Sequence, residues 1–209
     1  MFNDLDDTIK EMLVEQAQLD ASQVDISFDT PDREWASRLT RPTVNCFLYD
    51  VRENLELRKQ SWDVQRMDNG NQSSRRKPPM RVAATYQITA WARAREDEHR
   101  LLWRVLATLV KNVPLPVEVL KGDLVNQPVL PIPVKVAQEE DMPSNFADLW
   151  QALDNRIRPS ITYSVTLALD PAVEITTPLV LQPPTVRMDR MEPEPDKEQA
   201  PVPGRIVPG

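Results

Sequence analysis

Residues 24–54, VDISFDTPDREWASRLTRPTVNCFLYDVREN, contain two segments with the pattern of β-strands on either side of a charged connection. In residues 24–29, apolar and polar side chains alternate, which is typical of a strand with one buried face. Residues 43–51 carry apolar or aromatic side chains on both faces, and the connection is polar except for Trp35. The stretch therefore predicts a half-buried sheet with a charged, tryptophan-bearing rim, and it contains no set of residues that would form an active site.

The composition excludes several classes of function. A net charge of −7 argues against a nucleic-acid-binding protein, because phosphate recognition needs a basic surface. One histidine and one cysteine are too few for a zinc site of the usual kind, and the four isolated glycines cannot form a phosphate-binding loop. No apolar run approaches the roughly 20 residues of a membrane span. The acidic N-terminus is unlike a signal peptide, and the single cysteine fits synthesis in the cytoplasm.

Periodicity predicts the remaining secondary structure. Helices are expected at residues 3–17, 95–111 and 146–153, and strands at residues 82–91, 128–136, 161–169 and 173–181. Residues 66–80 form a polar, projecting loop in this interpretation, and residues 173–181 pair with residues 161–169. The threonine and serine faces of residues 82–91 and 161–169 are expected to make wet contacts. The pattern predicts an α/β (α+β) fold, in which two or three helices pack on a mixed, mainly antiparallel sheet.

The composition changes after residue 181. Residues 182–209 contain many prolines and no aromatic residue, so they cannot build a core of their own. We therefore expect a folded domain over residues 1–181, followed by an extended, proline-rich C-terminal tail.

The residues with reactive side chains have ordinary structural interpretations. His99 lies among acids in the first turn of a predicted helix, which favours a surface position, although an enzyme that uses His99 with a carboxylate stays an alternative. Cys46 lies within a predicted strand, which favours a small buried hydrophobe. The acidic runs coincide with helix N-termini or lack the pattern of a calcium loop. The sequence therefore predicts no catalytic residue, no metal site and no cofactor.

Two polar segments are candidates for contact with other proteins. Trp35 lies between charged residues, and a tryptophan in such a place is either a core plug or an interface anchor. A second, basic cluster lies in the predicted projecting loop. The candidate interface residues are Arg33, Glu34, Trp35, Arg38, Arg75, Arg76 and Lys77.

Seven ordered stretches carry a resemblance to a known family. They are DLDDTIKEML (4–13), VDISFDTPDREW (24–35), RPTVNCFLYDVREN (41–54), RRKPPMRVAATYQITAWA (75–92), DEHRLLWRVLATL (97–109), LWQAL (149–153) and RPSITYSVTLALD (158–170). Together they make the chain similar to the tail-terminator or cap proteins of extracellular contractile injection systems, which are phage-tail-like particles. The tail after residue 181 does not match the family pattern.

The resemblance implies a fold related to phage tail terminators and a structural, non-enzymatic role. A homo-hexameric ring would cap the inner tube protein, contact the last layer of the sheath protein, stop polymerisation and so fix particle length. The chain would be made in the cytoplasm and join a particle that is either released or held at a membrane. An alternative is a cap adaptor, which would join the terminator to a second cap subunit or an anchoring component. A generic adaptor outside any particle is the other alternative.

Overall fold

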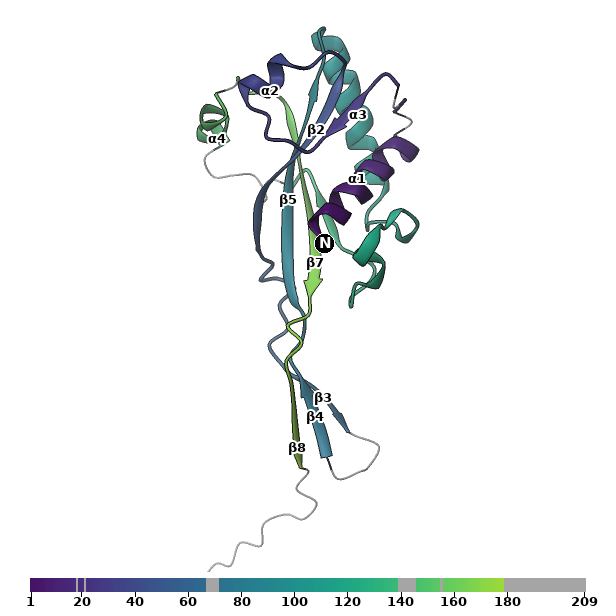
Figure 1. Ribbon diagram of the computed structural model, residues 1–209, viewed down its shortest axis with the longest axis vertical. Coiled ribbons are helices and arrows are strands. Elements are labelled where there is room, and N and C mark those ends of the chain that lie inside the picture. The colour runs from purple at the N-terminus through teal and green to yellow at the C-terminus, as the bar shows by residue number, and fades with distance from the viewer. Residues whose placement is uncertain (18, 21, 67–71, 139–145, 155, 179–209) are drawn as a thin grey trace, which may run out of the picture.

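The computed structural model describes residues 1–17, 19–20, 22–66, 72–138, 146–154 and 156–178. These residues form a five-stranded sheet, in the order β1-β2-β5-β7-β6, and a three-stranded sheet, in the order β3-β4-β8. Figure 1 shows the five-stranded sheet within a broad body and the three-stranded sheet projecting from it as a narrow arm. The body strands are β1 (Asp25–Ser27), β2 (Thr43–Glu53), β5 (Met80–Trp91), β6 (Val134–Val136) and β7 (Ser160–Leu169). The arm strands are β3 (Asp63–Arg66), β4 (Gln72–Arg76) and β8 (Glu174–Pro178).

The body sheet is mixed but mainly antiparallel. Only β1 is parallel to its neighbour β2, whereas β2–β5, β5–β7 and β6–β7 are antiparallel pairs. The long central strand β5 pairs along most of its length on both sides, which places Cys46 of β2 and Ile161 of β7 opposite Ile88. The predicted fold class is therefore confirmed.

Helices cover the body sheet unequally. They are α1 (Phe2–Gln16), α2 (Arg33–Ser37), α3 (Arg95–Lys111) and α4 (Phe146–Ala152), and short 3-10 turns occupy η1 (Val117–Val119) and η2 (Gly122–Asn126). In Figure 1, α1 and α3 lie on one side of the sheet and α2 and α4 lie at one end of the body. The apolar faces of α1 and α3 meet the sheet in one large core, as their 3.6-residue periodicity predicts. That core includes Ile9, Met12, Val105, Leu109 and Tyr86.

The N-terminal part of α1 is fastened to η2. Lys121 donates its backbone N–H to the Thr8 hydroxyl at 3.0 Å, and Asp123 donates its own to the Asp4 carboxylate at 3.3 Å. Gly122 between them has a φ of +52°, and an added Cβ would come within 2.4 Å of the Asp4 carboxylate. A side chain at this position would therefore meet both a strained backbone and a steric clash.

The opposite face of the central strands is polar, yet it is buried within this chain. Its members Thr85, Gln87, Thr89, Ser164 and Thr166 are all buried. Thr85 and Ser164 share a hydroxyl–hydroxyl hydrogen bond of 3.3 Å, which satisfies polarity inside the fold. The expectation that this face makes wet contacts is therefore wrong for these residues.

Two connections differ from the sequence-based predictions. The connection after β1 contains the helix α2, because the Asp32 carboxylate caps it by accepting a hydrogen bond from the Trp35 backbone N–H at 2.7 Å. The expected loop at residues 66–80 contains the strand β4 and the start of β5, while residues 67–71 lie outside the described part. β4 becomes a strand because it is hydrogen-bonded on both sides, by β3 and β8.

The C-terminal strand also pairs differently from the prediction. β8 pairs with β4 in the arm and not with β7, because both edges of β7 are already occupied by β5 and β6. The strand predicted at residues 128–136 shrinks to β6, which lies at the sheet edge as its prolines suggested. The predicted tail at residues 182–209 lies outside the described residues.

Candidate assembly interfaces

Three tryptophans form a second, smaller core at the end of the body that carries α2 and α4. Trp35 of α2, Trp91 at the end of β5 and Trp150 of α4 are 7%, 4% and 1% exposed. The rings of Trp35 and Trp91 meet edge to face, with centroids 5.3 Å apart and an interplanar angle of 82°. Such aromatic pairs contribute about 0.5–1.5 kcal/mol beyond their area burial. This cluster fixes where α2 and α4 sit on the sheet.

Arg158 closes the tryptophan cluster. Its guanidinium carbon lies 4.0 Å from the centroid of the Trp91 ring, and the same group forms an ion pair with Glu98 of α3. Glu98 also accepts a hydrogen bond from the Ala92 backbone N–H at 3.3 Å. Arg158 thus joins the segment before β7 to both β5 and α3.

Trp35 is a core residue and not an interface anchor, which decides between the two roles that the sequence left open. Its ring packs inside the chain, and its indole Nε1 donates a hydrogen bond to the Asp29 carboxylate at 3.3 Å. Its α2 neighbours Arg33 and Glu34 and the following Arg38 are exposed. Trp35 therefore holds α2 in place, while these charged side chains face solvent.

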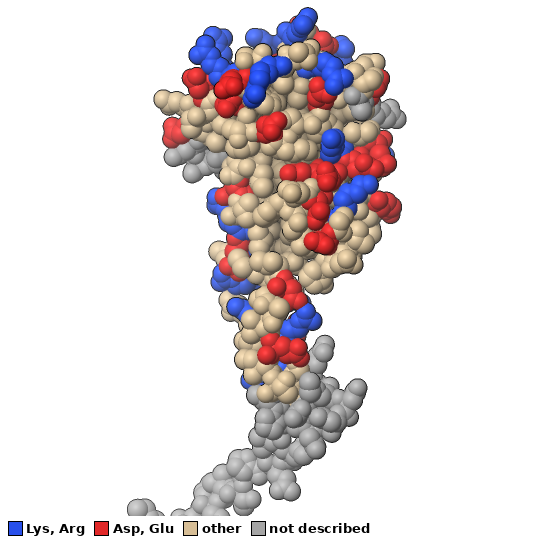
Figure 2. Space-filling model, in the orientation of Figure 1, with Lys and Arg blue, Asp and Glu red and all other residues tan. Residues whose placement is uncertain are grey.

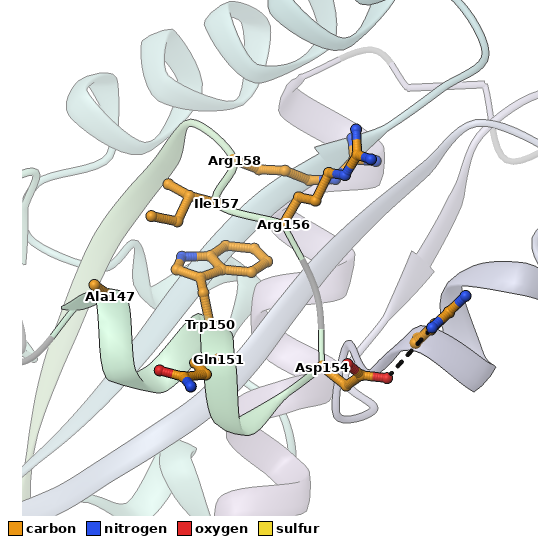
Figure 3. A pocket seen from close by; sticks show the side chains of 8 residues that line it. Ala147, Trp150, Gln151, Asp154, Arg156, Ile157 and Arg158 are labelled. Atoms are coloured by element: carbon orange, nitrogen blue, oxygen red, sulfur yellow. Dashed lines mark ion pairs between the residues drawn. The ribbon is translucent and has the colours of Figure 1, made fainter.

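Two hollows adjoin this cluster. The first, of about 620 Å³, appears in Figure 3. It is lined by Arg33, Ala147, Trp150, Gln151, Asp154, Arg156, Ile157 and Arg158. The second, of about 570 Å³, shares Arg158 and includes Arg41 and Arg93. Arg33 pairs with Asp154 at 3.8 Å, and this ion pair neutralises part of the positive charge in the lining of the first hollow. Figure 2 shows basic side chains at the top of the body, with acidic side chains among them. We call the end that carries α2 and α4 the α2–α4 end.

The arm carries the second set of candidate residues. Arg75 pairs across the strands with Val64 and Ile175, so these three side chains share one face of the arm. All three are exposed, and with Trp62 they line a shallow hollow of about 260 Å³. Lys77, just after β4, is exposed as well. The arm therefore presents apolar and basic groups together on one face.

Arg76 has an internal partner. It forms an ion pair with Asp170 in the connection from β7 to β8. The pKa of the Asp170 carboxyl is lowered, first by a hydrogen bond from the Ala172 backbone N–H and second by Arg76. Ser74 on the same face donates a hydrogen bond to Glu174. Arg76 therefore fastens the root of the arm.

The two candidate sets lie at opposite ends of the molecule. Figure 1 places α2 at one end of the long axis and β4 in the arm at the other. The structure thus does not bring Arg33, Glu34, Trp35 and Arg38 together with Arg75, Arg76 and Lys77. It defines two separate candidate interfaces, one at the α2–α4 end and one on the arm.

The residues with reactive side chains, His99 and Cys46, lie outside the two candidate interfaces. His99 is exposed on α3. Cys46 is buried in the main core, and this burial strongly raises the pKa of its thiol. Within the described ranges, no group of His, Cys, Asp and Glu side chains has an arrangement that would hold a metal ion. None of the helices among the described residues has the length and apolar character needed to cross a bilayer.

Trp103 is the most exposed of the aromatic side chains that the sequence did not single out. Trp103 of α3 is 69% exposed, and Val110, seven residues further along the helix, is exposed too. Leu101 and Val105 of the same helix point into the core. A signal was present, because Trp103 lies off the apolar stripe that residues 101, 105 and 109 define.

The fold is α+β, and the exposed candidate residues lie on two separate surfaces of it. The model of the Pvc16 N-terminal domain family matches residues 4–182, and the chain belongs to this family. A search among curated proteins gave no significant match.

Two solved structures are similar to this chain. One is the sheath/tube terminator, in the extended state, of PVC, an extracellular contractile injection system. It is 23% identical with a TM-score of 0.63, over 91% of this chain and 65% of that one, and at this identity it supports the fold. The other is the tube-terminating cap of the anti-feeding prophage, 25% identical with a TM-score of 0.56, over 87% of this chain and 60% of that one. This chain therefore spans less than two thirds of either relative. Both relatives are structural components, in agreement with the expectation that the chain is not an enzyme.

Proposed function

We propose that this chain is a structural cap subunit that ends the inner tube and sheath of a contractile injection particle. The observation that carries the proposal is the family match over residues 4–182. The similarity to a tube-terminating cap and to a sheath/tube terminator names the kind of particle.

A terminator needs one surface that binds the growing end and a different surface on its far side, and this molecule has two different ends. A growing tube offers the same unsatisfied surface at each layer, so its end stays open until a subunit binds without repeating that surface. The α2–α4 end is broad and hollowed, whereas the arm is narrow and carries an apolar and basic face. Contact through one of these ends leaves an unlike surface at the other, which supports the role.

The finer parts of the proposal concern assembly. The chain forms a homo-hexameric ring, contacts the inner tube and sheath proteins, and fixes particle length by stopping growth. We assign Arg33, Glu34 and Arg38 to one docking surface, because they are exposed beside a buried anchor that holds them in place. Arg75 and Lys77 belong to the second surface, on the arm.

Electron microscopy tests the role directly. Particles made without this chain should have abnormally long or ragged tubes and sheaths, and supplying the intact chain should restore a uniform length. Electron microscopy of the purified chain should show six-fold rings. Normal particle length without the chain would contradict the terminator role, and loss of only another cap component would favour the adaptor alternative. A purified dimer would contradict the ring.

A further inference from the structure

The neck between the body and the arm contains a pocket of about 480 Å³ that lies apart from the α2–α4 end. Its walls come from the end of β2, the segment before β3, the connection from β4 to β5, and the connection from β7 to β8. Trp62, Met80 and Leu169 line it, and all three are exposed large hydrophobic side chains. The pocket therefore has an apolar wall open to solvent.

The polar lining of this neck pocket is mostly cationic. It contains the four basic side chains of Arg58, Lys59, Lys77 and Arg81 and the single carboxylate of Glu53. The Glu53 carboxylate already accepts a hydrogen bond from Arg58 Nε at 2.6 Å, and this contact lowers its pKa. In a chain whose net charge is −7, this is a local excess of positive charge.

Arg81 is the decisive residue. Its side chain lines the pocket although the residue is only 9% exposed. Its Nε atom is buried without a hydrogen-bond partner, and among the described residues its guanidinium has no ion-pair partner. Burial lowers the pKa of its guanidinium. A cation that is partly desolvated and lacks a counter-charge favours an anion beside it.

In a neighbouring groove, basic and acidic side chains occur together. The groove of about 700 Å³ on the arm side of the neck shares Lys59 and Lys77 with the pocket. It also contains Arg76 and three carboxylates, and Arg76 is bound to one of them, that of Asp170. Among the described residues, Arg76 therefore has a carboxylate partner, whereas Arg81 has none.

We propose that the neck pocket binds an acidic peptide segment of another protein, with a carboxylate at Arg81 and Lys77 and an apolar side chain against Trp62. Charge complementarity with the cationic lining selects an acidic occupant. The volume of about 480 Å³ and the apolar wall exceed what a free carboxylate or phosphate ion fills, and ligand pockets of this kind combine apolar walls with a few polar groups. This binding does not depend on the cap role.

Fluorescence anisotropy with the full chain and a labelled peptide tests the proposal. The probe is a short peptide that alternates Glu and Leu, and its matched control replaces each Glu by Gln. The Glu peptide should bind saturably at low salt and more weakly as salt screens the charges, whereas the Gln peptide should not bind. The variants Arg81→Met and Lys77→Ala should each weaken binding about tenfold or more, because hydrogen bonds to charged groups contribute on that scale. Trp62→Ala should weaken it as well.

The controls separate this inference from simpler explanations. Lys10→Ala removes an exposed cation from α1, far from the pocket in sequence and fold, and should leave binding unchanged. Circular dichroism verifies that Arg81→Met folds, and the exposed position of Lys77 provides a second variant that leaves the core intact. Equal binding by all variants would overturn the proposal, as would the absence of binding. Competition by inorganic phosphate as effective as by unlabelled peptide would show a simple anion site instead. Self-association that Lys77→Ala abolishes, without peptide binding, would make a second copy the occupant.

Discussion

The guanidinium of Arg158 lies 4.0 Å from the centre of the Trp91 ring and also pairs with Glu98. One side chain thereby connects the segment before β7, the end of β5 and the first turns of α3. Since α2 and α4 pack on the same tryptophans, the geometry of the α2–α4 end depends on this contact.

Replacement of Arg158 should loosen the α2–α4 end. Arg158→Ala removes the cation–π contact and leaves the carboxylate of Glu98 without its cation, so we expect a loss of about 1–3 kcal/mol in the free energy of unfolding. Arg158→Lys keeps the charge but not the planar stacking, and should recover part of the loss. Urea denaturation measures both. Arg93→Ala, an exposed neighbour, is the control, and an equal loss there would contradict this assignment.

Variants of α2 should show that its buried tryptophan stabilises the fold, whereas the neighbouring arginines act in docking. Trp35→Ala empties a buried site in the tryptophan cluster and should destabilise the chain by about 3–5 kcal/mol. Arg33→Ala and Arg38→Ala remove only exposed side chains and should change stability by less than about 0.5 kcal/mol. Thermal unfolding measures the first effect. In particle assembly, the variant that carries both Arg33→Ala and Arg38→Ala should fold but cap poorly. Normal particle lengths with this variant would contradict the docking role of α2.

Arg81 should be required for binding of the acidic peptide but not for folding. Arg81→Met keeps the apolar stem of the side chain and removes a buried, uncompensated charge. We therefore expect a melting temperature equal to or above that of the unmodified chain, together with loss of peptide binding. A scanning calorimetry trace compares the two proteins. A clear fall in melting temperature would mean that Arg81 has a stabilising partner in the folded chain.

The root of the arm should weaken in acid. The pKa of Asp170 is lowered by the Ala172 backbone N–H and by Arg76, so its ionised form stabilises the fold. This contribution is present above the unfolded pKa of about 4 and is lost as the pH falls through the lower folded value. Hydrogen exchange of β4 and β8 should therefore accelerate, relative to β5, below about pH 4 after correction for intrinsic rates. Asp170→Asn should show the faster exchange already at neutral pH, and unchanged protection would refute the role of the ion pair.

Long periodic segments of this chain were predictable from the sequence. The helix at residues 95–111 and the strand at residues 82–91 carry their pattern in their own residues, so α3 has the predicted bounds and β5 differs from its prediction by two residues at one end. The charged residues at the α2–α4 end and on the arm were also recognisable as exposed. The helix α2 was missed because its five residues are too few to show a helical period, and because its position depends on the burial of Trp35 against distant tryptophans.

The sequence by itself determined the main core and the family, because periodic apolar residues and ordered motifs are properties of single segments. Only the tertiary structure decided that Trp35 packs inward and that β8 leaves the body to build the arm. Among the described residues, it also left Arg81 without an ion-pair partner. These outcomes depend on which distant segments occupy the neighbouring space, since burial and strand pairing are set by partners far away in the chain.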